Sequence, residues 1–207
     1  MAFASQRPKT LILVSRTKEK VESVASSIRD VYPDVRVEVV VMDLASQASV
    51  RNAATAVFGI IEALDVLINN AAATFTHRHL TEEKIEKQFG VNHIGPFLFT
   101  KLLMPLLEAA ARQTPPGSTR IINLTSHGHR LSPIRFHDYN IEGKEVPDEE
   151  RPPSNMPPLF SRKDDDGYMS TIAYAQSKTA NVLFTLYLQR HLGDRGIASY
   201  VVHPGGK

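Results

Sequence analysis

The chain has 207 residues, of which 42% are hydrophobic and 22% charged, and its formal net charge is +2. This length allows one well-buried core, and the near-balanced charge indicates neither nucleic acid nor an anionic membrane as a partner. The chain has no cysteine, which excludes disulfides, thiolate metal sites and a cysteine nucleophile. No apolar run approaches a membrane span and the first residues do not look like a signal peptide, so we expect a cytoplasmic protein with a single domain over residues 1–207.

Short β-type runs alternate with helical patterns along the chain. In order, we predict a strand at 10–15, a helix at 18–31 capped by Thr17, a strand at 36–42, a helix from Ser46 to about Ala63, a strand at 66–69, a short polar helix opened by Thr81, a longer helix at 91–112, a strand at 120–124, a helix at 172–192 and a strand at 197–202. This alternation indicates an α/β fold with a doubly wound parallel sheet covered by helices on both faces.

Polar or small residues follow three of the predicted strands. Asn70, Ala71 and Ala72 come after the strand at 66–69, Ser126 follows the strand at 120–124, and Pro204 and Gly205 follow the last strand. Because parallel strands end at the same edge of a sheet, and ligands bind there in such folds, we expect these residues to line one site.

Tyr174 and Lys178 stand four residues apart in a helical pattern, so both side chains project from one face of the helix. A nearby ammonium favours the phenolate form of a tyrosine, which can then exchange protons nearer neutral pH. Taken alone, the pair also fits a solvated helix face.

These motifs occur together in an informative order. Asn-Asn-Ala-Ala after a strand, Asn92 in Val-Asn-His-Ile-Gly, Ser126 after a strand, Tyr174-x-x-x-Lys178 and His-Pro-Gly resemble the short-chain dehydrogenase/reductase family, and most of all its retinol-dehydrogenase-like members. The resemblance covers nearly the whole chain. It implies a Rossmann-like fold and an oxidoreductase that transfers a hydride between a nicotinamide cofactor and a small-molecule carbonyl or alcohol substrate, which we expect to be lipophilic.

The resemblance also implies a role for each catalytic residue. Tyr174 would be the general acid/base, and Lys178 would favour its phenolate while hydrogen-bonding the nicotinamide ribose. Ser126 would hold the substrate oxygen, where hydrogen-bond donors stabilise the developing alkoxide. Asn92 would bind a water that links Lys178 to solvent.

The cofactor residues are carried over in the same way. The resemblance places Asp43 and Leu44 at the adenine, Asn70 and Ala71 along the adenosine, Pro204 and Gly205 beside the nicotinamide, and Arg16 at the ribose 2′-phosphate. A basic residue at the last of these positions favours NADP(H) over NAD(H). Ala72 departs from the family, which usually has glycine there, and its methyl group would crowd the cofactor.

Structural interpretations compete with several of these assignments. Ser126 could cap a turn, Asn70 could satisfy loop backbone, Asp43 could be an acid at a helix entry, and Arg16 could be an ordinary surface residue. The histidine pairs at 77 and 79 and at 127 and 129 suggest a metal, but no His-Glu-x-x-His helix or carboxylate cluster accompanies them, so we expect none. Ser126 also lacks the G-x-S-x-G elbow of a serine hydrolase.

A long segment from 130 to 169 separates Ser126 from Tyr174 and contains six prolines and two charged clusters. Loops of this length are usually substrate lids or disordered. We interpret its first part, through Tyr139, as a substrate-covering insertion, and its charged second half as mobile.

The first glycine of the chain is Gly59, so no glycine-rich turn precedes the strand at 10–15. In the fold implied by the resemblance, a first strand and that turn hold the pyrophosphate, and this strand lies between those at 10–15 and 66–69. We therefore expect an incomplete domain, truncated at both ends, that binds NADP(H) poorly by itself. The alternative function is that of a non-catalytic remnant or interaction protein. Relatives pair through helices equivalent to 91–112 and 172–192, so a homodimer or homotetramer is also expected.

Overall fold

The computed structural model describes residues 1–205. Its five strands are β1 (Thr10–Ser15), β2 (Arg36–Val41), β3 (Val66–Asn69), β4 (Thr119–Leu124) and β5 (Ile197–Val202). Every ladder is parallel, and the strands form two sheets, with β1 beside β2 and with β4 between β3 and β5. In the described chain no ladder joins β1 to β3, in agreement with the expectation that these two strands are not neighbours.

The helices lie between the strands in the order that the sequence predicts. They are α1 (Lys18–Val31), α2 (Gln47–Phe58), the short α3 (Lys87–Phe89), a π-helical turn (Gly90–Ile94) that leads into α4 (Gly95–Ala111), and α5 (Ser170–Leu192). Short 3₁₀ turns occur at Ala4–Gln6, His127–Leu131, Asp148–Glu150 and Gly193–Arg195. The fold is therefore α/β with helices that cross over between parallel strands, as predicted.

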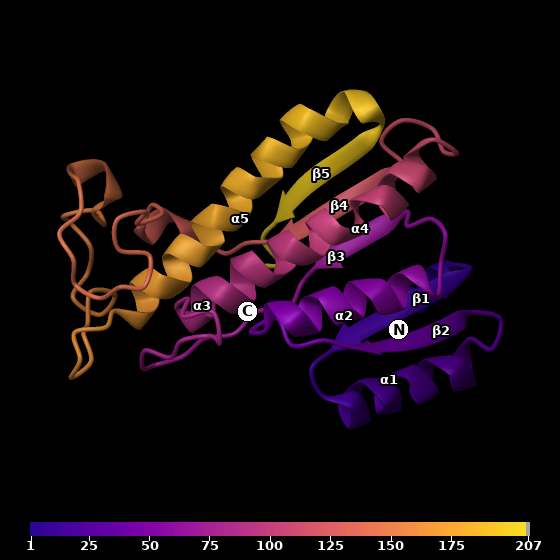
Figure 1. Cartoon of the computed structure of the whole chain (residues 1–207), viewed down its shortest axis with the longest axis horizontal. Coiled ribbons are helices and arrows are strands. Elements are labelled where there is room, and N and C mark those ends of the chain that lie inside the picture. Colours follow the sequence, from indigo (N-terminus) through magenta and orange to yellow (C-terminus); the bar gives the residue numbers. More distant parts are fainter. Residues whose placement is uncertain (206–207) are drawn as a thin grey trace.

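The ribbon in Figure 1 shows α1 and α2 beside strands β1 and β2. The side chains of β1 alternate between two apolar layers. Leu11 and Leu13 contact the layer that α1 covers, whereas Ile12 and Val14 contact the main core with α2 and α4. This two-residue period places helices on both faces of the β1–β2 sheet, which is the doubly wound arrangement.

Several predicted boundaries need correction. Helix α4 begins at Gly95 and ends at Ala111 instead of spanning 91–112, β4 begins at Thr119, and α5 begins at Ser170. Strand β2 ends at Val41 and not at Met42, and α2 ends at Phe58 because Gly59, a poor helix former, stands at its C-cap. No helix begins at Thr81; the carboxylate of Glu86 caps α3 instead. Ser46 caps α2 as predicted, with its side chain accepting from the Ser49 N–H, but Thr17 makes no such bond at the start of α1.

Helix α4 is apolar and lies in the main core. By length and composition the stretch Lys87–Ala111 could cross a membrane, which corrects the expectation that no apolar run approaches a span. Its buried side chains Phe99, Leu103 and Leu107 instead pack against α2 and β4 in the core. These are the contacts of a central helix in an α/β domain.

The segment at 130–169 packs against α5 through specific contacts. The buried pair Arg135 and Asp138 is 3.0 Å apart, and the amide of Gln176 on α5 donates to the carbonyl of Tyr139 at 2.7 Å. Ile141 and Tyr168 are fully buried against the start of α5. The segment therefore forms a small second apolar cluster beside the N-terminal end of that helix.

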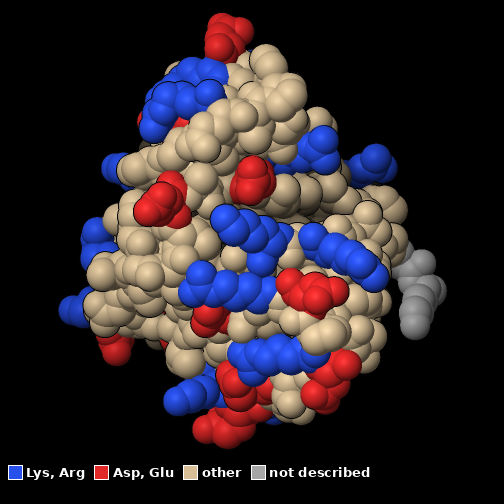
Figure 2. All heavy atoms as spheres, turned by 90° about the vertical axis from the view of Figure 1, so that its right-hand side faces the viewer, with Lys and Arg blue, Asp and Glu red and all other residues tan. Residues whose placement is uncertain are grey.

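Charges are mixed on the surface. Figure 2 shows lysine and arginine interspersed with aspartate and glutamate over the end of the molecule that lies at the right of Figure 1. This end carries no patch of a single sign that would steer a polyanion.

Candidate active site

Tyr174 and Lys178 lie on adjacent turns of α5 and contact each other. The Lys178 Nζ lies 5.5 Å from the centre of the Tyr174 ring and donates to the Leu124 carbonyl at the end of β4, at 3.2 Å. Lys178 is 3% exposed, and burial lowers the pKa of its ammonium. One carbonyl takes only one of three N–H donors, so two remain for a ligand.

Ser126 follows β4, and its side chain lies near Gly128, as the Tyr174 ring does. Its Oγ accepts from the Gly128 N–H at 3.2 Å, which leaves the hydroxyl hydrogen free to donate. A Cβ placed on Gly128 would lie 3.3 Å from the Tyr174 ring and 3.6 Å from the Ser126 Oγ. Tyr174 and Ser126 therefore flank one glycine, although they stand 48 positions apart in the chain (174 − 126).

We expect Gly128→Ala to reduce activity more than stability. The added methyl would meet the Tyr174 ring at 3.3 Å and displace it by a few tenths of an ångström. Catalytic groups tolerate little displacement, so we expect kcat/KM to fall roughly 10-fold or more, with a small change in Tm. Gly59→Ala is the matched control, since its methyl would meet only the Ala56 carbonyl at 3.4 Å. Equal activities of the two variants would contradict the tight packing around Gly128.

Asn92 lies in the π-helical turn before α4 and is 1% exposed. Its Oδ1 accepts from the Ala73 N–H at 2.7 Å, and its Nδ2 donates to the Ala73 carbonyl and to the Ser177 Oγ, at 3.0 and 3.2 Å. Asn92 thus fixes the loop after β3 to the residue that precedes Lys178. π-Helical turns often occur at functional sites. The assigned role of Asn92, to bind a water that links Lys178 to solvent, stays a prediction.

A buried amide network that the sequence did not reveal lies under the strand ends. The Asn69 Nδ2 donates to the Asn123 Oδ1 at 2.8 Å, and the Asn123 Nδ2 donates to the Thr185 hydroxyl at 3.0 Å. Asn181 donates to the same Leu124 carbonyl as Lys178, at 3.1 Å. The only sequence signal was polar residues inside apolar strands and helices, and these amides now hold β3, β4 and α5 in register.

Arg16 follows β1, and Asp43 and Leu44, which were assigned to the adenine, follow β2. Arg16 is exposed, and within residues 1–205 no carboxylate lies within ion-pair distance of it. The Asp43 Oδ1 accepts from the Ala45 N–H at 2.9 Å, so this carboxylate also serves the helix-entry role. A Cβ on Gly95 would lie 2.6 Å from the Leu44 carbonyl oxygen, so only glycine lets α4 approach Leu44 this closely.

The remaining assigned residues follow β3 and β5. Asn70 and Ala71 are exposed on the loop after β3. Pro204 and Gly205 are exposed after β5, and Gly205 adopts a φ of 89° and donates to the His203 ring at 2.8 Å. The His203 ring lies 4.0 Å from that of His127, which joins the ends of β4 and β5.

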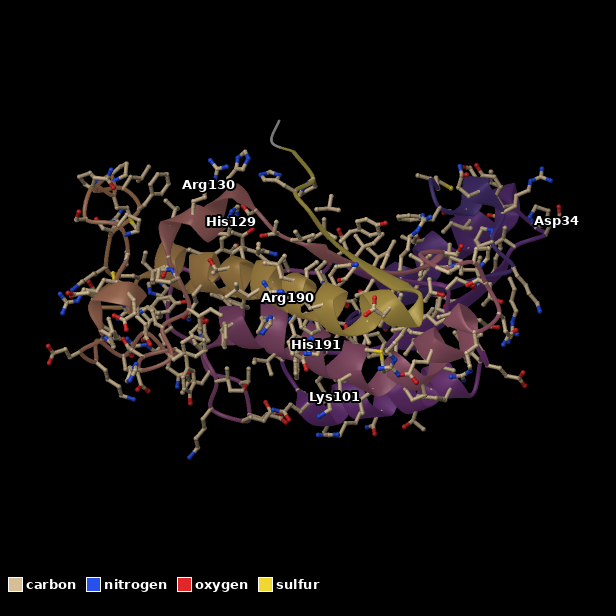
Figure 3. All side chains as sticks on the ribbon, turned by 90° about the horizontal axis from the view of Figure 1, so that it is seen from above. Asp34, Lys101, His129, Arg130, Arg190 and His191 are labelled. Carbon is tan, nitrogen blue, oxygen red and sulfur yellow. The ribbon has the colours of Figure 1, made fainter. Side chains whose placement is uncertain are left out.

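Figure 3 places His129 and Arg130 beside the first half of α5, and Arg190 and His191 farther along the same helix. The Thr179 hydroxyl on α5 lies 2.8 and 2.7 Å from the carbonyl oxygens of His129 and Ser132, which share its single hydrogen. The turn after Ser126 is thereby fixed to α5. No group of three or more metal-ligating side chains occurs among the residues that the structure describes.

A pocket of about 230 Å³ opens next to Tyr174. It is lined by Thr74, Phe75, Thr76, Gln88, Ser170, Thr171 and Tyr174. In the described chain no residue of the segment 130–169 lines it, and Ile134 and Phe136 line a separate groove along α4 and α5. The substrate-covering role of the segment stays a prediction. The phenol therefore borders a space that suits a small organic group.

The sequence matches the short chain dehydrogenase family over residues 1–140. The chain belongs to this family of oxidoreductases, and within it resembles the retinol dehydrogenases, as predicted. It is 36% identical to oxidoreductase fscI of Fusarium equiseti, covering 100% of this chain and 80% of that protein. It is 37% identical to human retinol dehydrogenase 13, covering 97% of this chain but only 52% of that protein.

The fold is shared with solved structures. The NADPH-bound carbonyl reductase from chicken fatty liver superposes with a TM-score of 0.63 at 21% identity, covering 96% of this chain and 69% of that chain. The predicted Rossmann-like class is therefore confirmed.

Proposed function

We propose that the protein is an NADP(H)-dependent reductase or dehydrogenase that interconverts a lipophilic carbonyl compound and its alcohol. The observation that carries this proposal is the position of Tyr174, which borders the pocket, lies beside the Lys178 ammonium and shares its contact with Gly128 with the Ser126 hydroxyl. A proton donor, a cation and a second hydroxyl donor then surround one point where a substrate oxygen can lie.

Lys178 on α5 and Arg16 after β1 offer donors that fit NADP(H). Lys178 retains two N–H donors for a ribose, and the exposed Arg16 guanidinium offers a fork of donors that suits a phosphate. When bound, the nicotinamide supplies or accepts the hydride. The carbonyl reductase of the same fold is bound to NADPH, and the retinol dehydrogenases are named for a lipophilic alcohol, which supports both parts of the proposal.

The protein side chains handle the substrate oxygen and its proton. The Ser126 hydroxyl donates to the carbonyl oxygen and stabilises the negative charge that develops on it. Tyr174 gives its phenolic proton to the same oxygen during reduction and takes it back during oxidation. Lys178, held in place by the Leu124 carbonyl, places its charge beside the phenol and favours the phenolate after proton transfer.

The coenzyme preference tests the assignment of Arg16. We expect Arg16→Asp to replace attraction to a 2′-phosphate with repulsion and to lower the NADPH/NADH preference roughly 10- to 100-fold, since a charged hydrogen bond contributes about 1.5–3 kcal/mol. Affinities for both coenzymes are measured by calorimetry, together with reduction of a panel of aldehydes and ketones.

Lys20→Asp on the exposed side of α1 makes the same change of charge without removing Arg16. It should leave the preference within about 2-fold, since surface charges are screened. If the unmutated protein already prefers NADH, Arg16 does not read the 2′-phosphate.

A further inference from the structure

The pocket beside Tyr174 is walled by segments that lie far apart in the chain. One wall is the loop 74–76 after β3, the other is the start of α5 at 170–174, and Gln88 of α3 lies at the pocket with both. The spacing of these walls determines which substrate groups can reach Tyr174.

Gln88 bridges the two walls from below the surface. Its side chain is 1% exposed, and its Nε2 lies 3.0 Å from the Ser170 carbonyl and 3.4 Å from the Phe75 carbonyl. The same Nε2 lies 2.7 Å from the Tyr168 hydroxyl. The amide group of Gln88 has only two hydrogens. They form the two short bonds, to the Tyr168 hydroxyl and the Ser170 carbonyl, and the longer contact to the Phe75 carbonyl shares one of them.

Tyr168 and Glu86 fix the orientation of Gln88. The fully buried Tyr168 donates its hydroxyl hydrogen to the Glu86 Oε1 at 2.8 Å, which directs the oxygen lone pairs toward Gln88. The Glu86 carboxylate also accepts from the N–H groups of Gln88 and Phe89, at 2.8 and 2.7 Å. Burial raises the pKa of Glu86, and burial together with this carboxylate raises that of Tyr168.

This network has features that a simple helix cap does not need. Three bonds to backbone or solvent would satisfy Glu86, yet the chain uses a buried tyrosine 82 residues away in sequence. Arg78, whose guanidinium lies 5.7 Å from the centre of the Tyr168 ring, also donates to the Ile141 carbonyl at 2.6 Å. The loop after β3, α3 and the segment before α5 are thus joined at one buried point directly behind the pocket.

We propose that Gln88, oriented by Tyr168 and Glu86, is a positioning residue that sets the width of the substrate pocket and so selects carbonyl substrates by the breadth of their apolar group. The proposal rests on the function proposed above. It identifies Tyr168 as the residue that transmits the position of the 164–170 segment to the pocket.

The test compares two aldehydes that differ in breadth but not in the reacting group, benzaldehyde and 2-naphthaldehyde. Gln88→Leu removes the contacts that join the walls, Tyr168→Phe removes the hydroxyl that orients Gln88, and Tyr187→Phe, on the exposed side of α5, is the matched control. We expect both network variants to raise the naphthaldehyde/benzaldehyde ratio of kcat/KM by about 5-fold or more through KM, with kcat for benzaldehyde changed less. The ratio is insensitive to the fraction of folded protein, because that fraction cancels.

Hydrogen exchange provides a readout that needs no turnover. Backbone amides of 74–76 and 170–172 should exchange faster in both network variants than in the control, because the bridge is lost in Gln88→Leu and is no longer held in one orientation in Tyr168→Phe. An unchanged or lower ratio in both variants overturns the proposal, even if their Tm falls, since the network then supports only the fold. If the unmutated protein reduces neither these two aldehydes nor any other aldehyde or ketone of a broad panel, the proposed function fails instead. In that case hydrogen exchange alone decides the positioning role: unchanged exchange at 74–76 in both network variants overturns it.

Discussion

Replacing Tyr174 with phenylalanine should lower carbonyl reduction with NADPH by about 10² to 10⁴, the range typical of a general acid/base. The change removes only the hydroxyl, for which the described residues provide no hydrogen-bond partner. The ring keeps its contact with Lys178, so the NADPH dissociation constant measured by calorimetry should change by no more than about 3-fold. The loss should therefore appear in kcat and not in coenzyme affinity.

Tyr187→Phe controls for the same chemical change elsewhere on α5. Tyr187 is 54% exposed and stacks on His191, away from the pocket. Its variant should retain turnover within about 2-fold, as surface substitutions usually do. Near-full turnover by the Tyr174 variant would end its proposed role as proton donor.

Lys178→Met should abolish most turnover without lowering stability. The ammonium is buried at a desolvation cost, and the Leu124 carbonyl keeps its bond from Asn181 at 3.1 Å after the lysine is removed. Methionine matches the length of the lysine stem, so we expect a fall in kcat of about 10² or more with an unchanged or higher free energy of unfolding. A large drop in both would indicate that Lys178 is chiefly structural.

The pH dependence of stability gives a second check on Lys178. Because its folded pKa is lowered, the unfolded state binds more protons than the folded state at alkaline pH, between the folded value and the unfolded value of about 10.4. The free energy of unfolding contributed by this residue therefore rises with pH across that window. Urea unfolding at several pH values should show this rise in the unmutated protein and a smaller one in the methionine variant.

Local patterns were sufficient to predict most of the fold. The short apolar run of β1 and the Ser46 cap of α2 are short-range signals, and both elements begin where predicted. The end of α2 and the supposed helix at Thr81 were wrong because a glycine and a capping carboxylate, Glu86, decided those boundaries. Both determinants are local, because Gly59 stands at the C-cap itself and Glu86 accepts from the N–H groups of the residues that follow it, Gln88 and Phe89.

The candidate site was predictable where its residues share a helix or follow a strand. Tyr174 and Lys178 are joined by helix geometry, and Ser126 by the common edge of parallel strands. The role of Gly128 and the bonds from Tyr168 to Glu86 could not be predicted, because they join segments separated by long irregular stretches. The expectation that 130–139 covers the substrate relied on loop length alone and stays a prediction; the residues that line the pocket beside Tyr174 lie in other segments.

The most direct measurement follows the hydride itself. The protein is incubated with NADPH deuterated at the transferable position of the nicotinamide and with a lipophilic aldehyde, and the alcohol is analysed by mass spectrometry. We predict one deuterium on the carbinol carbon, formed by the unmutated protein and reduced about 10²-fold or more by Tyr174→Phe. A folded protein that binds NADPH, yet yields no deuterated alcohol from any aldehyde or ketone of a broad panel, would contradict the account.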